Sequence, residues 1–327
     1  MKNKITVRRY QKSDFTQWNS FINEAKNSTF LFHRDFMEYH SDRFEDFSLL
    51  IFEKETLLAV LPANRVESTV ISHQGLTYGG LVLGNKTLLA DAICIVQKVL
   101  EFLNESQIQT LHLKIIPSIY NTIPSDEMEY ISFLIKANLI RKDSLAVVDT
   151  TCLIPISRVR KRGIEKGNSL GLIVKEETDF TSFWNQLLVP NLDIRYQTKP
   201  VHSLDEITYL KSKFTNNIKQ FNVYFENKLI GGVTVFFTKN VIHPQYISGN
   251  KEFNNIYGGL DFLYNFLLTK LNTEARFFDF GPSNESNGLQ LNESLHYWKE
   301  SFGARTIVQN FYEIETKNYS LLEHVLV

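Results

Sequence analysis

Short segments with the same alternation of hydrophobic and polar residues occur in both halves of the chain, in the same order. The matches are FEKETLLAV from Phe52 with FENKLIGGV from Phe225, VISHQ from Val70 with VIHPQ from Val241, DFT at Asp14 with DFT at Asp179, and the strand-closing prolines Pro117 and Pro282. Each match alone could arise by chance. Their common order favours a duplicated domain over one large fold.

The first half has the pattern of a helix, paired strands, a second helix and a further strand. The expected elements are a helix beginning at Ser13 or Asp14, a hairpin over 47–53 and 56–62, a helix over 88–103 and a strand over 111–116. The pattern starts again near Pro155. We therefore expect two domains, 1–154 and 155–327.

The second half repeats this order of strands and amphipathic helices. The expected elements are a helix opened by the capping box of Ser203 and Glu206, strands over 221–226, 229–238 and 242–248 with a tight turn at Asn227-Lys228, a helix after Gly258-Gly259, and a strand over 276–280. Strands and helices mixed in this way predict an α/β fold of the α+β type, with a mixed sheet in each half.

Composition narrows the class of protein. The 327 residues are 43% hydrophobic and 22% charged, as in ordinary globular proteins, and the net charge of −1 provides no global attraction for DNA. The first residues lack the apolar core of a secretory signal, and no apolar run is long enough to cross a bilayer. Cys94 and Cys152 have no histidine at ligand spacing. We expect a cytoplasmic protein without a disulfide or a bound metal.

Glycines before the last long helix suggest an anion site. A helix N-terminus has unpaired N–H groups, so a phosphate or pyrophosphate could bind at Asn255, Tyr257, Gly258 and Gly259. Gly-Gly before a helix is also a common turn, and this alternative stays open.

Several segments resemble the FemAB-like branch of the GNAT acyltransferase superfamily over nearly the whole chain. They are YISGN with YGGLDFL, FFDFG ending at Gly281, KESFGAR from Lys299, SHQGLTYGG from Ser72 and TFLFHRDFMEYHSDRF from Thr29. The resemblance implies two tandem GNAT-like domains and transfer of an acyl or aminoacyl group to an amine. The acceptor would be a small or sugar-linked amine of a cell-envelope precursor.

The resemblance leaves the donor open. Some family members use aminoacyl-tRNA to build peptidoglycan cross-bridges, and others resemble acyl-CoA enzymes acting on amino sugars. We favour an acyltransferase using acyl-CoA as co-substrate, with no permanently bound cofactor, although 255–259 departs from the Q/R-x-x-G-x-G/A acyl-CoA signature. The alternatives are an aminoacyltransferase, for which the basic run from Arg158 to Lys166 could bind tRNA, and an inactive binding module.

Amide formation needs a base for the acceptor amine and a group that polarises the carbonyl. Asp279 is our first choice for the base, with His243 and Glu285 as the other catalytic candidates. The substrate-binding candidates nearby are Gln245, Tyr246, Ser283, Asn284 and Lys299. Asp279 lies among phenylalanines, where burial would raise its pKa as a base requires. It could equally accept backbone N–H bonds, His243 could be a core histidine, and Glu285 a surface carboxylate.

The first half provides the expected acceptor cleft, with His73 and Tyr78 as substrate-binding candidates. If Pro117 aligns with Pro282, Lys114 takes the place of Asp279, so catalysis is expected in the second half. His73 and His243 would then lie at nearly equivalent strand positions, as a purely structural duplication also predicts.

Overall fold

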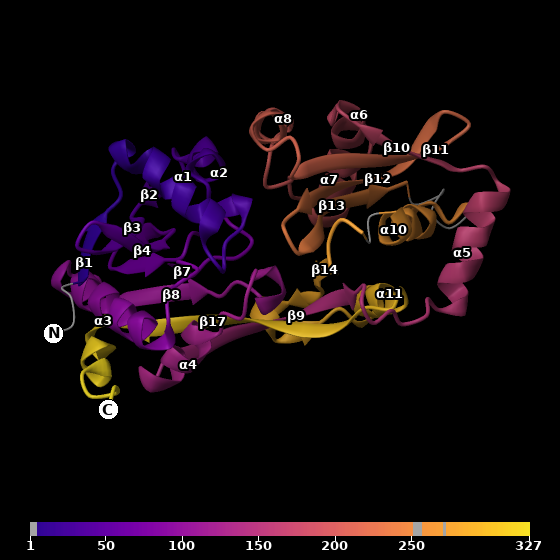
Figure 1. Ribbon diagram of the computed structural model, residues 1–327. Helices are drawn as coiled ribbons and strands as arrows, with labels where there is room; N and C mark the ends of the chain where they lie inside the picture. The colour runs from indigo at the N-terminus through magenta and orange to yellow at the C-terminus, as the bar shows by residue number, and fades with distance from the viewer. Residues whose placement is uncertain (1–4, 251–256, 271–272) are drawn as a thin grey trace. The chain divides into compact units, whose positions relative to one another are not determined.

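The computed structural model describes residues 5–250, 257–270 and 273–327, which form two compact units (Figure 1). The first unit comprises Met1–Asp143, Ser286–Leu289 and Val308–Val327, and the second comprises Ser144–Glu285 and Gln290–Ile307. The chain thus passes to the second unit at Asp143, and its last segment returns to the first. The predicted domain bounds 1–154 and 155–327 follow the sequence copies and stay a prediction.

The first unit contains two sheets, β1-β3-β4-β7 and β17-β8-β6-β5-β2. Its elements are β1 (Ile5–Arg9), α1 (Phe15–Glu24), α2 (Arg34–Met37), β2 (Glu45–Asp46), β3 (Leu49–Glu53), β4 (Thr56–Leu61), β5 (Asn64–Val66), β6 (Thr69–Ile71), β7 (Val82–Leu83), α3 (Leu89–Glu105), β8 (Thr110–Lys114), α4 (Glu127–Leu134) and the first half of β9 (Asn138–Asp149). Short 3₁₀ turns lie at Lys12–Asp14, Phe30–Phe32, Glu38–His40, Ser118–Tyr120, Ser286–Gly288 and Thr316–Leu322. The predicted hairpin and helices of this half are confirmed.

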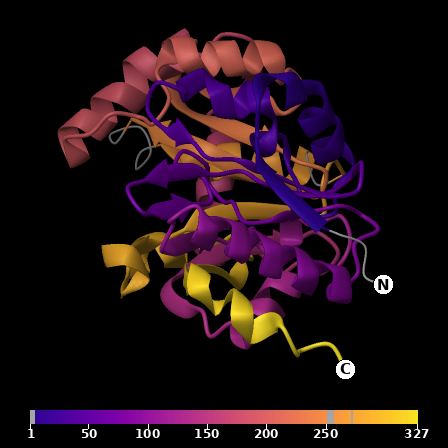
Figure 2. The same ribbon diagram turned by 90° about the vertical axis from the view of Figure 1, so that its left-hand side faces the viewer.

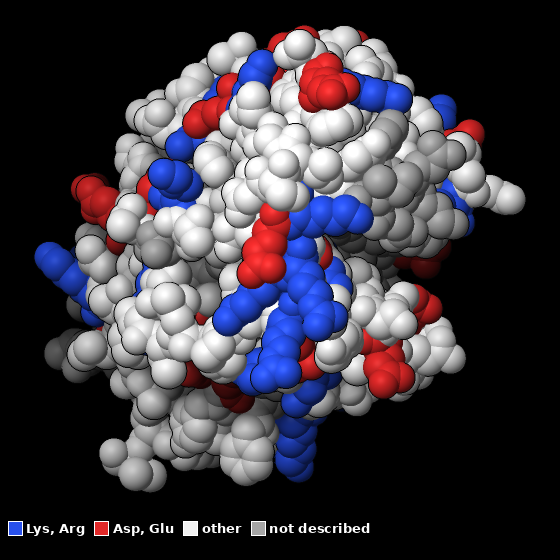
Figure 3. Space-filling view, turned by 90° about the vertical axis from the view of Figure 1, so that its right-hand side faces the viewer, with Lys and Arg blue, Asp and Glu red and all other residues white. Residues whose placement is uncertain are grey.

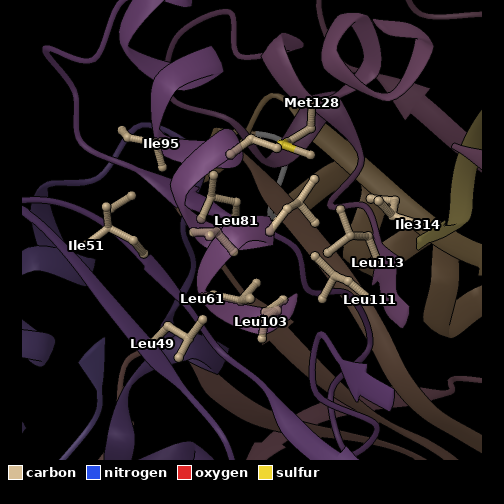
Figure 4. Packing of buried hydrophobic residues seen from close by; sticks show 14 of the residues in the cluster. Leu49, Ile51, Leu61, Leu81, Ile95, Leu103, Leu111, Leu113, Met128 and Ile314 are labelled. Carbon is tan, nitrogen blue, oxygen red and sulfur yellow. The ribbon is translucent and has the colours of Figure 1, made fainter. Parts of the chain in front are cut away.

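The core of the first unit lies between β3, β4, β8 and the helices α3 and α4. Figure 4 shows its members, among them Ile51, Ile95, Leu113 and Met128, with side chains directed toward one another. Ile314 of β17 belongs to the same core and is fully buried, although it comes from the end of the chain. The C-terminal 3₁₀ turn also packs on α3, as Figure 2 shows.

The second unit contains a sheet segment with the strand order β10-β11-β12-β13-β14-β9 and the two-stranded sheet β15-β16. Its elements are α5 (Arg158–Ser169), β10 (Ile173–Glu177), α6 (Thr181–Phe183), a π-helical turn (Trp184–Leu188), α7 (Val189–Tyr196), α8 (Leu204–Lys213), β11 (Ile218–Phe225), β12 (Lys228–Phe237), β13 (Val241–Gly249), α10 (Gly259–Lys270), β14 (Phe277–Pro282), β15 (Asn284–Glu285), β16 (Gln290–Leu291), α11 (Glu293–Glu300) and the first part of β17 (Arg305–Glu315). The α/β mixed-sheet fold predicted from the sequence is confirmed.

Helices cover both faces of this sheet, and two adjacent glycines show which helix lies on each. A Cβ at Gly232 would lie 2.5 Å from Phe183 of α6, whereas one at Gly231 would lie 3.3 Å from Leu260 of α10. Because successive strand residues face opposite sides, α6 and α10 lie on opposite faces. Figure 1 shows the same arrangement around β12.

The capping box and the hairpin turn predicted for this half are both present, but the turn lies one residue earlier than predicted. The capping box of α8 is confirmed, since Ser203 Oγ accepts from Glu206 N and Glu206 Oε2 accepts from Ser203 N. The hairpin turn lies at Glu226 and Asn227, whose φ angles are 45° and 64°, so our placement at Asn227-Lys228 was one residue late. A two-residue hairpin turn of this kind needs positive φ, which asparagine adopts readily.

The two copies exchange their final strands. Strand β9 closes the first copy, but its second half pairs with β14 in the second unit, from Phe277–Asp149 to Pro282–Leu145. Strand β17 closes the second copy, and its second half pairs with β8 in the first unit, from Phe311–Lys114 to Glu315–Thr110. Each unit therefore needs a strand from the other copy.

Ile314→Ala tests this exchange. Truncating a fully buried isoleucine should lower the free energy of unfolding by about 2–4 kcal/mol, and hydrogen exchange should accelerate in α3 and β8 of the first unit. Val308→Ala, at a half-exposed position of the same strand, is the control and should have little effect. Faster exchange confined to β11 and β12 would contradict the assignment of β17 to the first unit.

Candidate functional site

Two neighbouring parallel strands in the second unit separate after a short pairing. Val241 pairs with Phe277 and Ile242 with Phe278, and the ladder between β13 and β14 ends there, although both strands continue and are described throughout. We call the diverging segments, 243–249 and 279–283, the fork. Beyond Ile242 and Phe278, the facing edges of the two strands no longer bond to each other as a ladder.

Both strands are irregular where they diverge. On β13, Thr234 pairs with Tyr246 and Val235 with Pro244, so Gln245 is an extra, bulged residue. On β14, the pairing with β9 shifts between Asp279 and Pro282, and Gly281 has φ 74°. Bulges re-aim side chains and end regular pairing, and here they widen the separation of the strands.

His243 lies at the base of the fork with a defined ring orientation. Its Nδ1 is 2.9 Å from the backbone oxygen of Asp279. Because a carbonyl oxygen can only accept, Nδ1 carries the proton in this arrangement, and Nε2 of the neutral ring keeps its lone pair. A Cβ at Gly281 would lie only 3.2 Å from the ring's Cε1, so that glycine leaves room for the imidazole.

Asp279 is nearly fully buried, with 2% of its surface exposed. Its Oδ1 accepts the N–H of Gly281 at 2.7 Å, and its Oδ2 lies 3.6 Å from His243 Nδ1. The carboxylate therefore holds the turn after β14 and adds negative charge beside the imidazole. Of the two alternatives open from the sequence, the geometry favours acceptance of a backbone N–H bond.

Lys299 reaches the same strand end from α11. Its Nζ donates to the backbone oxygens of Gly281 at 2.9 Å and Pro282 at 2.6 Å, and only 5% of the residue is exposed. Burial lowers the pKa of Lys299 to about 8, and the nearby Asp279 carboxylate only partly opposes this effect. An ammonium group with a lowered pKa and an imidazole thus both lie next to Gly281.

Two further predicted residues bring buried oxygen atoms to the fork. Ser283 Oγ and Gln245 Oε1 are inaccessible to solvent and have no hydrogen-bond partner within the described part of the chain. Buried polar atoms are nearly always paired. Neither atom is open to solvent in this structure, so the substrate contacts predicted for Ser283 and Gln245 stay predictions.

The other candidates of the second half lie in structural contacts. Glu285 is exposed and accepts from Asn292 Nδ2 at 3.0 Å, and Asn284 Oδ1 accepts the N–H and hydroxyl of Ser144. Tyr246 is buried against Trp184, and its hydroxyl lies 2.5 Å from His202 Nδ1. Burial raises the pKa of Tyr246 to about 12. His202, a lone histidine before the capping box, had no signal in the sequence that marked this contact.

At the predicted anion site before α10, two of the four predicted residues are in close contact with other parts of the protein. Asn255 lies outside the described residues, and Tyr257 stacks on Phe225 with ring centroids 4.7 Å apart. Gly258 has φ 66°, and a Cβ there would lie 2.4 Å from the backbone oxygen of Gly163 in α5. Gly259 is buried. Close contact between two helices thus accounts for glycine at 258 without a bound phosphate.

The first unit has a corresponding parallel pair, but its strands do not form a fork. Strand β6 pairs with β8 from Thr69–Thr110 to Ile71–His112. Beyond that point Ser72 Oγ accepts the N–H of Lys114, and Gly79 returns to bridge Ile115. In the first unit, protein groups thus continue to link the two strands beyond their ladder, whereas β13 and β14 show no further ladder pairing after Ile242 and Phe278.

The two predicted substrate residues of the first unit have different surroundings. His73 follows β6 in a turn with φ 62°, two residues after the last ladder pair, whereas His243 lies within β13, one residue after it. The two histidines are therefore close to equivalent but differ by one position. Tyr78 is buried and donates its hydroxyl to Thr29 Oγ1, which makes it a core residue of this unit.

Comparisons with known proteins were made by sequence and by structure. No protein-family model matches the chain, and no curated protein matches it by sequence. FemX matches by structure, with a TM-score of 0.65 and 8% identity over 97% of this chain and 99% of FemX. The duplicated order of elements and this likeness decide the fold. The chain has a FemAB-like tandem GNAT fold.

Two further structures are similar to this chain in fold. The C-terminal domain of a protein described as a lysylphosphatidylglycerol synthetase, from Agrobacterium fabrum, has a TM-score of 0.62 and 12% identity over 95% of this chain and 96% of that one. L-PGS from Bacillus licheniformis has a TM-score of 0.60 and 11% identity over 95% and 93%. At these identities the likeness concerns the fold.

Lys299 offers a direct test of the fork's electrostatics. The εCH₂ resonance of Lys299, assigned by its disappearance in Lys299→Arg, should titrate with a midpoint near pH 8. The ammonium form then predominates below that pH and is lost above it. A midpoint at the ordinary lysine value, about 10.4, would contradict the burial of the amine against the two carbonyl oxygens.

Proposed function

We propose that the protein is an N-acyltransferase that transfers an acyl group directly to an amine at the fork of the second unit. The observation that carries the proposal is the end of the β13–β14 ladder beside His243, Asp279 and Lys299. The fold supports a transferase of the GNAT type, and the site supplies an imidazole and a buried ammonium group at one strand end. The acceptor we propose is an amine of a cell-envelope precursor, such as an amino sugar.

In this mechanism His243 is the base. Its Nε2 takes a proton from the acceptor nitrogen as that nitrogen bonds to the donor's carbonyl carbon, while Nδ1 stays bonded to the Asp279 carbonyl oxygen. The bond from the carbonyl carbon to the leaving sulfur or oxygen breaks, and the leaving group receives the proton. The Lys299 ammonium stabilises the negative charge that develops in this step.

This assignment changes our order of candidates for the base. Asp279, our first choice, already accepts the Gly281 N–H, and Glu285 is exposed on a short hairpin. Direct transfer needs no covalent intermediate, and the two cysteines lie on α3 and in the turn after β9, outside the fork. Asp279 then positions the turn and the imidazole.

Acyl-CoA is the donor that we propose. The edge of β13 beyond Ile242 has no ladder partner on β14 and can pair with an extended chain that carries amides, as a sheet edge does with peptides. On β14 the backbone oxygens of Asp279, Gly281 and Pro282 are already bonded to side chains, so the donor would pair with β13. The pantetheine arm of CoA is such a chain. Its thioester would end beside His243.

An aminoacyl-tRNA donor is the second candidate, supported by the surface of α5. Gly163 and Gly167 of this helix pack against α10. The basic residues on the other side of the helix are exposed to solvent; they are Arg158, Lys161, Arg162 and Lys166. Figure 3 shows Lys and Arg gathered on this side of the molecule. A basic face of this kind can bind a phosphate backbone regardless of sequence.

Binding and transfer assays separate the donors. Acetyl-CoA or CoA at about a hundred times its dissociation constant should add about 2.7 kcal/mol to the free energy of unfolding. A stabilised protein that acetylates an amino sugar supports the proposal. Transfer from charged tRNA without any effect of CoA would favour the second candidate, and a protein that binds acceptor but neither donor would be a binding module.

His243→Asn is the sharpest variant of the proposed base. The asparagine amide can still donate to the Asp279 carbonyl oxygen, but it has no group at the place of Nε2. Turnover should fall by about 10²–10⁴-fold, with an unchanged unfolding midpoint. His112→Asn, at a half-buried histidine of the first unit, is the matched control and should keep full turnover. Turnover retained in His243→Asn would remove this residue from the mechanism.

Neutralising α5 tests the second candidate. Replacing Arg158, Lys161, Arg162 and Lys166 with glutamine should leave CoA binding unchanged if acyl-CoA is the donor. If tRNA is the donor, its affinity should fall, and the salt dependence of binding should flatten by about one unit of slope for each lost phosphate contact. Filter binding over a range of salt concentrations measures both quantities.

A further inference from the structure

The first unit contains a hollow of about 380 Å³ that the proposed reaction does not use. It lies where the start of the chain, the segment after α2 and the turn after β6 meet. Its lining residues are Tyr10, Lys12, Arg34, Met37, Glu38, Ser41, Phe44, Asp46 and His73. Ligand sites in proteins begin at about 300 Å³, so this hollow has room for a ring-sized small molecule.

Arg34 forms the floor of the hollow and is fixed on several sides. It is 3% exposed, and it donates to Glu38 Oε1 at 2.8 Å, to Asp46 Oδ2 at 2.5 Å and to Ser48 Oγ at 3.1 Å. Its guanidinium also lies 3.7 Å from the ring centroid of Tyr10. A buried cation with two carboxylate partners and an aromatic partner is largely neutralised.

The charges that line the hollow balance. Two cations, Lys12 and Arg34, stand against two carboxylates, Glu38 and Asp46. The carboxylates remain accessible, with side-chain exposures of 35% and 38%. Each can therefore accept hydrogen bonds from a ligand while it holds Arg34. The two carboxylates would repel an anionic ligand, and Lys12 would repel a cationic ligand.

His73 adds a neutral polar group held in an unusual conformation. It is 4% exposed and has φ 62°, and its N–H donates to Ile71 O at 2.6 Å in a tight turn. Burial, together with the nearby His40, lowers the pKa of His73 to about 3, so the imidazole is neutral at physiological pH. Its Nδ1 has no partner among the described residues. Strain and an unpaired buried nitrogen together are typical of functional sites.

Aromatic rings complete the wall. Phe44 packs against His73 with ring centroids 5.4 Å apart, and Tyr10 packs edge-on against Trp18 at 5.5 Å. Both Tyr10 and Phe44 line the hollow and are only partly buried. Their carbon surfaces can pack against an apolar face of a ligand.

We infer that this hollow is a binding site for a neutral carbohydrate ring. A pyranose presents hydroxyl donors to Glu38 and Asp46, hydroxyl acceptors to Lys12, and an apolar C–H face to the aromatic wall. A charge-balanced site with carboxylates, one neutral imidazole and aromatic carbon fits such a ring better than it fits a phosphate. The inference concerns a different unit from the fork, and it holds whether or not the fork performs acyl transfer.

Ligand-observed NMR on the whole protein tests this inference without requiring activity. The probes are glucose, galactose, mannose and N-acetylglucosamine, with inorganic phosphate as the anion. A ring of about a dozen non-hydrogen atoms should bind with a dissociation constant in the millimolar range. We expect at least one sugar to bind saturably. We expect that phosphate does not displace it.

A matched pair of variants locates the site. Ser41→Trp places an indole in the hollow from an exposed position and should weaken sugar binding at least tenfold. Asp42→Trp adds the same bulk one residue along, outside the lining, and should bind as the unmodified protein does. Both positions are exposed, so both variants should keep the unfolding midpoint.

Three results would overturn the inference. One is the absence of binding by every sugar at roughly ten times the expected dissociation constant. Another is sugar binding that Ser41→Trp leaves unchanged. The last is displacement of the sugar by phosphate that binds in the hollow. The hollow would then be an anion site.

Discussion

The end of the ladder between β13 and β14 is the constraint on which the site depends. Parallel neighbours normally continue to pair, so the divergence after Ile242–Phe278 needs local causes. The bulge at Gln245 and the positive φ of Gly281 provide them, and Asp279 fixes the second by accepting the Gly281 N–H. The same divergence leaves a backbone carbonyl for His243 and two carbonyls for Lys299. The divergence of the two strands and the positions of the His243 and Lys299 side chains therefore depend on each other.

Within the described residues, the two copies differ in how their parallel strand pairs end. Both units have a parallel strand pair at the place marked by VISHQ and VIHPQ, but the first unit closes its pair with Ser72 and the Gly79–Ile115 bridge. The exchange of β9 and β17 makes each unit depend on the other copy for a strand. A closed copy is then retained for stability and is free to take a different role. The hollow beside Arg34 is consistent with such a division of labour.

The sequence predicted the elements well because they depend on local signals. The capping box at Ser203, the alternation in β11 to β13 and the periodicity of α3 each follow from nearby residues. The strand exchange could not be predicted, because β17 shows the same alternation whichever sheet it joins. His243 and Lys299 were recognised as polar residues in suggestive places. Their partners are backbone oxygens, which every residue carries and which no motif marks.

The central claim is that the donor binds in the fork of the second unit and not in the first. Hydrogen exchange with and without saturating CoA measures this most directly, peptide by peptide. The account predicts slower exchange in peptides that cover 241–249 and 277–285, with no change over 69–80 and 110–116. Protection of the first-unit peptides, with exchange in β13 and β14 unchanged by the bound ligand, would contradict it.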